Sequence, residues 1–164
     1  MSLLHATLVV VLVLRLVELT LARRNTARLL ARGGREVGAG HYPLFILLHV
    51  GWLAAIAVFG EAEPRWPVLL ILFALLQLAR GWVIWSLGDH WTTRIVTLDE
   101  APLVSRGAYR WCRHPNYVVV CLEILLLPLA FGAWEVALAA SLLNALLLWH
   151  RIRLESAALA NRRR

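Results

Sequence analysis

Four long apolar runs occupy most of this sequence. Three of them, at about residues 3–22, 43–60 and 66–88, have close to the ~20 residues that a helix needs to cross a bilayer. The fourth, at 117–150, is too long for one span, and Pro128 and Gly132 stand where a turn would divide it into helices of about 116–131 and 133–150. Hydrophobic residues make up 60% of the chain, against about 45–50% in soluble proteins. The sequence therefore predicts an all-α integral membrane protein with five transmembrane helices, the last two forming a short helical hairpin.

All 17 basic residues are arginine, and their distribution indicates an orientation in the membrane. The segments 23–41, 89–116 and 151–164 carry nearly all of the arginines outside the apolar runs, whereas the segments on the other side carry only Arg65. The positive-inside rule then places the N-terminus outside and both the 89–116 loop and the C-terminus in the cytoplasm, as in a bacterial inner membrane. The first run lacks the features of a cleaved signal peptide, so we expect it to be retained. Because the arginines lie between apolar runs, nothing indicates nucleic-acid binding.

Some charged residues lie inside the apolar runs. Arg15 and Glu18 are three residues apart and share a helix face, which predicts a structural ion pair. Glu123 needs a partner in a membrane, and either it pairs with Arg80 or Arg15 or it lines a channel for an acceptor. Segment 23–41, rich in arginine and then in glycine, predicts a short amphipathic helix followed by a flexible loop. Neither of the two cysteines has the spacing of a metal site or of a disulfide framework.

The segment Arg106–Tyr117 is the most distinctive polar stretch. It contains three arginines, a histidine, two tyrosines and a tryptophan, so it is too polar to cross a bilayer and too aromatic for an ordinary linker. Pro115 has no N–H and disfavours helical dihedrals at His114, so the following apolar helix should begin here, with Asn116 in a position to cap it. A helix N-terminus offers free N–H groups and partial positive charge, which suit an anionic ligand.

Arg151 and Glu155 form a second polar pair, on a predicted cytoplasmic extension of the last helix. They are four residues apart and therefore share a helix face. Such a pair is either an ordinary surface ion pair, worth about 0.3–0.5 kcal/mol, or a functional pair.

The run Arg113-His114-Pro115-Asn116-Tyr117, with Gly107-Ala108-Tyr109 before it and Arg151-Ile152-Arg153-Leu154-Glu155 after it, resembles the C-terminal half of the isoprenylcysteine carboxyl methyltransferase family. These integral membrane enzymes use S-adenosylmethionine. The resemblance covers about residues 80–159. It implies one membrane-embedded methyltransferase domain over 1–164, with a cofactor-binding catalytic half at 80–159, a cytoplasmic cofactor-binding loop and a C-terminal helix. The implied activity is S-adenosylmethionine-dependent O-methylation of a lipophilic acceptor at the cytoplasmic face, with no metal ion.

The same resemblance implies roles for individual residues. Arg151 and Glu155 would be the catalytic pair, with Arg151 holding the anionic group of the acceptor and Glu155 contacting the cofactor. The cofactor pocket would be formed, together with Glu155, by Ala101, Pro102, Leu103, Val104, Tyr109, His114, Pro115, Asn116 and Tyr117. At the position where carboxyl methyltransferases of the family often carry Gln, this chain has Arg94.

The acceptor chemistry stays open at this point. A carboxylate needs no base, whereas an enol or phenol must lose a proton, through its own acidity or to His114 or Glu155. The eukaryotic family members continue with a Gly- and Tyr-rich segment and have a second carboxylate where this chain has Ser156. This difference favours small bacterial members, some of which methylate alkylpyrones or alkylresorcinols, over a prenylcysteine acceptor. Two other functions remain as alternatives: an NADPH-dependent membrane reductase, and a non-catalytic protein whose loop arginines bind anionic membrane lipids.

Overall fold

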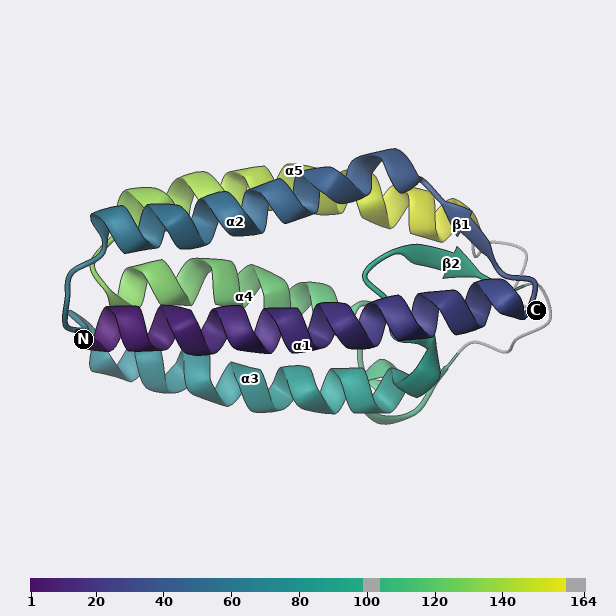
Figure 1. The fold of residues 1–164 in the computed structure, drawn as a ribbon, viewed down its shortest axis with the longest axis horizontal. Coiled ribbons are helices and arrows are strands. Elements are labelled where there is room, and N and C mark those ends of the chain that lie inside the picture. The colour runs from purple at the N-terminus through teal and green to yellow at the C-terminus, as the bar shows by residue number, and fades with distance from the viewer. Residues whose placement is uncertain (99–103, 159–164) are drawn as a thin grey trace.

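The computed structural model is a bundle of helices aligned along one long axis (Figure 1). It describes residues 1–98 and 104–158. The long helices are, in chain order, α1 Leu3–Ala31, α2 Tyr42–Phe59, α3 Pro67–Leu87, α4 Pro115–Ala130 and α5 Trp134–Ala158. Of these, α1, α2, α3 and α5 are long and apolar enough to cross a membrane, and α4 is a shorter apolar helix of 16 residues. The architecture is that of a helical membrane protein, and the fifth span stays a prediction that depends on α4.

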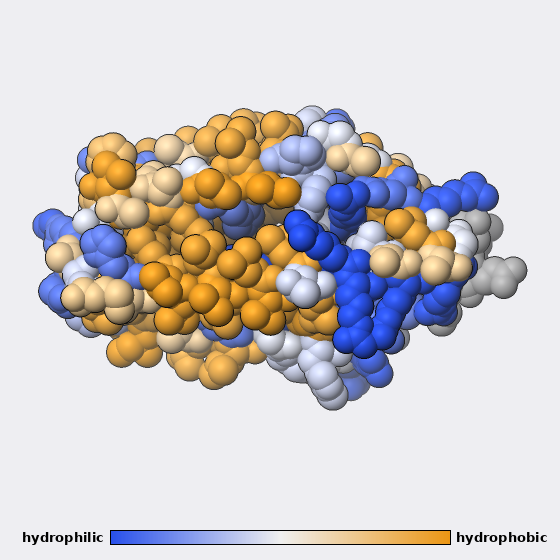
Figure 2. All heavy atoms as spheres, viewed as in Figure 1, coloured by the Kyte–Doolittle hydropathy of each residue, from blue (hydrophilic) through white to orange (hydrophobic). Residues whose placement is uncertain are grey.

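Apolar side chains cover the outside of the bundle as well as its core. Leu47 and Leu78 are 68% and 72% exposed, while Ile56 and Leu127 are fully buried. Figure 2 shows hydrophobic side chains over the helices and hydrophilic ones gathered at the end that carries the two strands. Because an exposed apolar belt of this kind is unfavourable in water and favourable in lipid, the surface agrees with a membrane location.

Helix α1 is longer than the sequence analysis predicted. The prediction of a span ending near residue 22, followed by a separate amphipathic helix, was wrong, because one continuous helix reaches Ala31. Arginine, alanine and leucine are strong helix formers, so charge alone does not end the helix. The helix ends just before Gly33, whose φ of 87° lies in the left-handed region that stops helices.

Two short strands join segments that the sequence analysis expected to be loops. β1 (Arg35–Val37) pairs antiparallel with β2 (Ile95–Thr97), with Glu36 opposite Val96. Arg94 donates to both carboxylate oxygens of Glu36, at 3.0 and 2.9 Å. Strands of three residues that pair across two helices leave no local pattern in a sequence. Through this pairing, the segment that follows α1 lies beside the segment that follows α3.

The α4–α5 turn lies at the break predicted from Pro128 and Gly132. The N–H groups of Phe131 and Ala133 donate to the carbonyl of Pro128, at 3.2 and 2.9 Å. Gly132 has a φ of 75°, and a Cβ there would lie 2.6 Å from a carboxylate oxygen of Glu61. Because α5 returns beside α4, the start of α4 and the C-terminal part of α5 lie toward the same end of the molecule (Figure 1).

A network of charged and amide side chains lies between α1, α3 and α4. Arg15 donates to Glu18 at 2.8 Å, as predicted, and to Glu123 at 3.0 Å. Arg80 donates to the same two carboxylates, at 2.8 and 2.9 Å, and Gln77 donates to Glu123 at 2.9 Å. Of the two predictions for Glu123, pairing with arginine is therefore the one that the structure shows. Two arginines and two carboxylates balance, so these four side chains carry no net charge together.

Candidate functional site

Ser86 anchors the loop that leads into α4. Its hydroxyl accepts from the N–H of Ala108 at 3.3 Å, and its carbonyl accepts from Nε of Arg106 at 3.0 Å. Between them, Gly107 begins the 3-10 turn η3 (Gly107–Arg110) with a φ of 57°. A Cβ at Gly107 would lie 2.1 Å from the Ser86 hydroxyl oxygen, so this close approach requires glycine.

Helix α4 begins at Pro115, where the sequence predicted a helix start. The carbonyl of His114 accepts from the N–H groups of Tyr117 and Val118, at 3.0 and 3.3 Å. His114 is the capping residue, without a side-chain cap, and the expected cap by Asn116 is wrong because Asn116 already lies in the first turn. This frees the Asn116 side chain, whose Oδ1 is buried with no hydrogen-bond partner among the described residues.

Tyr117 joins the start of α4 to the end of α5. Its hydroxyl donates to Glu155 and accepts from Nε of Arg151 at 2.9 Å. His114 stacks on the Tyr117 ring, with centroids 5.2 Å apart, and its Nδ1 lies 3.7 Å from a carboxylate oxygen of Glu155. The guanidinium of Arg151 also lies over the rings of Phe45 and Tyr117, at 5.4 and 5.7 Å. Four residues that the resemblance singled out thus form one cluster.

A polar cavity of about 510 Å³ lies beside this cluster. The predicted site residues that line it are Val104, Tyr109, His114, Asn116, Tyr117, Arg151 and Glu155. Pro115 is buried and starts the helix, but it is not part of the lining. The predicted residues Ala101, Pro102 and Leu103 lie outside the described residues. Burial, and next the negative charge of Glu155, raise the pKa of Tyr109 to about 12, so its hydroxyl stays protonated.

Residues after α3 that the sequence analysis did not select line the same cavity. They are His90, Trp91, Thr92, Arg94, Ile95 and Val96. Arg94, which departs from the family pattern, is one of them. The ring nitrogen Nε2 of His90 is buried with no hydrogen-bond partner among residues 1–98 and 104–158. No local sequence pattern marks His90 as a site residue, and it reaches the cavity only through the fold of the chain.

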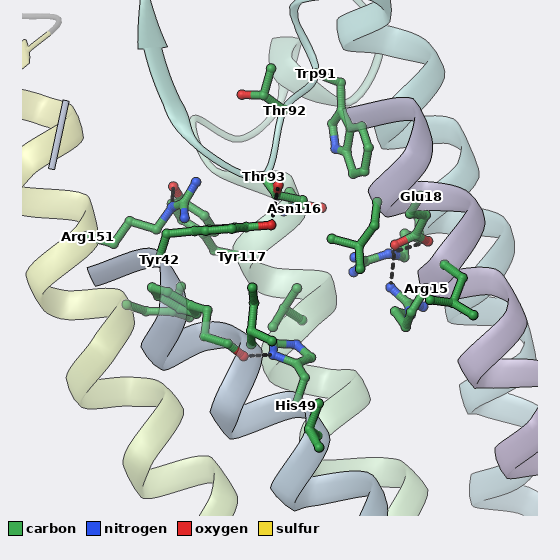
Figure 3. Close-up of a pocket in the computed structure, with 18 of the residues that line it drawn as sticks. Arg15, Glu18, Tyr42, His49, Trp91, Thr92, Thr93, Asn116, Tyr117 and Arg151 are labelled. Carbon is green, nitrogen blue, oxygen red and sulfur yellow. Dashed lines mark hydrogen bonds and ion pairs between the residues drawn. The ribbon is translucent and has the colours of Figure 1, made fainter. Parts of the chain in front are cut away.

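A second, apolar groove of about 240 Å³ adjoins the polar cavity (Figure 3). Its rim is formed by α1 and α2, where Leu12, Leu16, Ile46 and Val50 are 44–59% exposed on the side that faces lipid. Figure 2 shows the surface hollowed between these two helices. The groove and the cavity share Trp91, Thr92, Asn116, Tyr117 and Arg151. The Tyr117 cluster therefore stands at the boundary between a polar and an apolar chamber.

Comparison with known proteins decides the family. The model of the Isoprenylcysteine carboxyl methyltransferase (ICMT) family matches residues 69–161. The chain belongs to this family. The uncharacterized protein YpbQ of Bacillus subtilis is 36% identical to this ICMT family member over 155 residues, which cover 92% of each chain. An uncharacterized protein of Haemophilus influenzae is 25% identical over 169 residues, which cover 98% of this chain and 97% of its own.

Membership of the ICMT family implies a membrane methyltransferase, and ICMT family members use S-adenosylmethionine. The residues of this chain fit that cofactor. The orphaned Oδ1 of Asn116 can only accept a hydrogen bond, and the methyl donor carries amino groups that donate. The carboxylate of Glu155 complements a cationic sulfur or ammonium group. No three side chains of the types that bind metals lie together within the part of the chain that the structure describes.

Proposed function

We propose that this ICMT family member transfers a methyl group from S-adenosylmethionine to an oxygen of a lipophilic acceptor. The observation that supports this most directly is the meeting of the polar cavity and the apolar groove at Asn116, Tyr117 and Arg151. A water-soluble donor and a lipid-soluble acceptor need two chambers of opposite polarity with one shared boundary. The reaction would then take place at that boundary.

The polar cavity would hold the cofactor. Asn116 Oδ1 and His90 Nε2 would bond its polar groups, and Glu155 would pair with its positive charge. Tyr109 and Val104 would contact its remaining surface, and Ala101, Pro102 and Leu103 remain proposed contacts by family resemblance. When bound, S-adenosylmethionine supplies a methyl group made electrophilic by a positively charged sulfur.

Arg151 would hold the acceptor oxygen at the boundary. Arg151 is 8% exposed, and its guanidinium is held by the Tyr117 hydroxyl and two aromatic faces, so the side chain loses little conformational freedom on binding. A guanidinium can grip a carboxylate or an enolate with parallel hydrogen bonds. Since methyl transfer is an in-line displacement, holding the oxygen in position would contribute more than strong acid–base groups.

The acceptor is proposed to be an amphiphile such as a prenylcysteine, an alkylpyrone or an alkylresorcinol. Its chain would lie in the groove between α1 and α2, and its head would reach the boundary at the cytoplasmic face of a bacterial inner membrane. A carboxylate head needs no base. A phenol or enol head would lose its proton toward the Glu155–His114 pair, to which the Tyr117 hydroxyl is bonded.

Binding of S-adenosylmethionine to the detergent-purified protein, measured by calorimetry, tests the first half of this proposal. We expect Glu155→Ala and His114→Ala each to weaken binding about tenfold or more, since each removes a group at a charged contact. Glu135→Ala, at the opposite end of α5, is the matched control and should bind like the wild type. Binding of NADPH in place of S-adenosylmethionine would contradict the proposal and support a reductase; binding of neither would support the lipid-binding alternative.

Transfer of tritium from methyl-labelled S-adenosylmethionine tests the second half. The three acceptors are a long-chain alkylresorcinol, a long-chain alkylpyrone and a farnesylated N-acetylcysteine, and the product is counted after extraction into organic solvent. A product from any of them would support O-methylation and would identify the acceptor class. Cofactor binding without a product from any of the three would contradict the proposed acceptor classes.

A further inference from the structure

The apolar groove has a polar wall deep between the helices. Arg15 and Glu18 from α1 line it together with Arg80 from α3, and His49 from α2 lines it on the side facing α1. Figure 3 shows His49 and the Arg15–Glu18 pair on opposite sides of the groove. We call these four residues the polar waist. They lie well away from the Tyr117 cluster and have no part in the methyl transfer derived above.

His49 presents an unused hydrogen-bond acceptor to the groove. Its Nδ1 lies 2.7 Å from the carbonyl of Phe45, and a carbonyl only accepts, so Nδ1 carries the proton in the neutral ring. The lone pair is then on Nε2, which has no hydrogen-bond partner among the residues that the structure describes. The ring is held in place at its edge by Trp52, with centroids 6.3 Å apart.

The opposite wall presents a donor. Arg15 uses its two terminal nitrogens on Glu18, Gln77 and Glu123, which leaves its Nε–H without a partner in the described part of the chain. The side chains of Arg15 and Glu18 keep 14% and 15% of their surface exposed. Because the arginines and carboxylates of the network balance, the wall suits a neutral hydrogen-bonding group and not an ion.

The polar waist lies at a defined depth below the boundary where transfer is proposed. His49 follows Tyr42, which lines the groove beside the boundary, by two turns of α2, or about 10 Å. On α4, Glu123, which accepts from Arg15 and Arg80 of the waist, follows Asn116 by the same two turns. The partner of the waist arginines on α4 therefore lies at a similar depth to His49 on α2.

We propose that the polar waist binds a second, uncharged oxygen function on the acceptor, a hydroxyl or carbonyl about 10 Å from the methylated oxygen. A hydroxyl there would donate to Nε2 of His49 and accept from the arginine wall. A plain hydrocarbon chain would instead cover these polar atoms without replacing their hydrogen bonds to water, which is unfavourable. The inference rests on the proposed function in one respect, since it takes the groove to be the acceptor site.

Native mass spectrometry of the purified protein with an equimolar pair of lipids tests this proposal. The pair is stearyl alcohol and the matched diol whose second hydroxyl lies about 10 Å along the extended chain. We expect the wild type to bind the diol about fivefold better, the factor typical of one added hydrogen bond. His49→Leu should abolish the preference, His49→Gln should restore part of it through its amide oxygen, and His5→Leu, at the start of α1, should leave it unchanged.

Equal binding of the two lipids by the wild type would overturn the proposal and assign the polar waist to water alone. A preference that survives in His49→Leu would also overturn it. The lipid pair is measured without cofactor, so its outcome is separate from that of the proposed methyl transfer. A diol preference in a protein that fails to bind S-adenosylmethionine would refute only the proposed function.

Discussion

Tyr117 is the residue on which the geometry of the site depends most. One hydroxyl connects a carboxylate and a guanidinium that come from the far end of another helix. The ring beneath it stacks on His114 and forms part of both chambers. At the scale of single residues, the site is a tyrosine that sets the positions of Arg151 and Glu155 relative to each other.

Replacing Tyr117 with Phe removes the hydroxyl and keeps the ring. We expect kcat/KM for methyl transfer to fall about tenfold or more, because a hydrogen bond to a charged group contributes about 1.5–3 kcal/mol. The thermal unfolding midpoint in detergent should change little, since the stacking on His114 remains. A Tyr117→Phe enzyme with unchanged kinetic constants would show that Arg151 and Glu155 keep their positions without it.

At the scale of helices, the charge network fixes how α1, α3 and α4 pack. Apolar side chains alone give helices in lipid little reason to prefer one packing partner, because lipid is as apolar as they are. Glu123 and Arg80 are 4% and 7% exposed, and each bonds side chains from two other helices of the network. The network therefore gives these three helices a specific register.

Glu123→Leu should destabilise the protein by about 3–5 kcal/mol, because it leaves a positive charge buried without compensation. The charge-balanced double variant Arg80→Leu/Glu123→Leu keeps the Arg15–Glu18 pair and should lose less than the single variant Glu123→Leu. Unfolding midpoints in detergent measure both effects. A double variant that is less stable than both single variants would contradict the argument from charge balance.

At the scale of the whole molecule, an apolar belt lies between two ends that carry hydrophilic side chains (Figure 2). Arginines gather at the end that carries β1, η3 and the polar cavity, and Arg65 lies at the other end. This asymmetry supports the proposal that the cavity faces the cytoplasm, with the N-terminus outside.

Cys112, exposed in the loop before α4, can report this orientation directly. In a Cys121→Ser background, a membrane-impermeant maleimide should label Cys112 in inside-out vesicles and not in intact spheroplasts. The control Glu63→Cys with Cys112→Ser places the thiol in the α2–α3 connection and should show the reverse. Labelling of Cys112 in intact spheroplasts would contradict the proposed orientation.

Local patterns in the sequence were enough to predict the elements whose causes are local. Apolar runs near the length of a membrane span predicted the helices, and Pro115 and Gly132 marked where α4 begins and where the α4–α5 turn lies. The motif around His114 and the Arg151–Glu155 spacing were sufficient to recognise the ICMT family. These features are visible because each depends on neighbours within a few residues.

The features that depend on distant partners are visible only in the folded molecule. The fold paired β1 with β2 and brought His90 and Arg94 to the cavity. In the folded molecule Glu123 also pairs with Arg15 and Arg80, and a groove with the polar waist lies between the helices. Hydropathy and spacing say which face of a helix is polar, but which other helix meets that face is decided by the packing of the whole bundle.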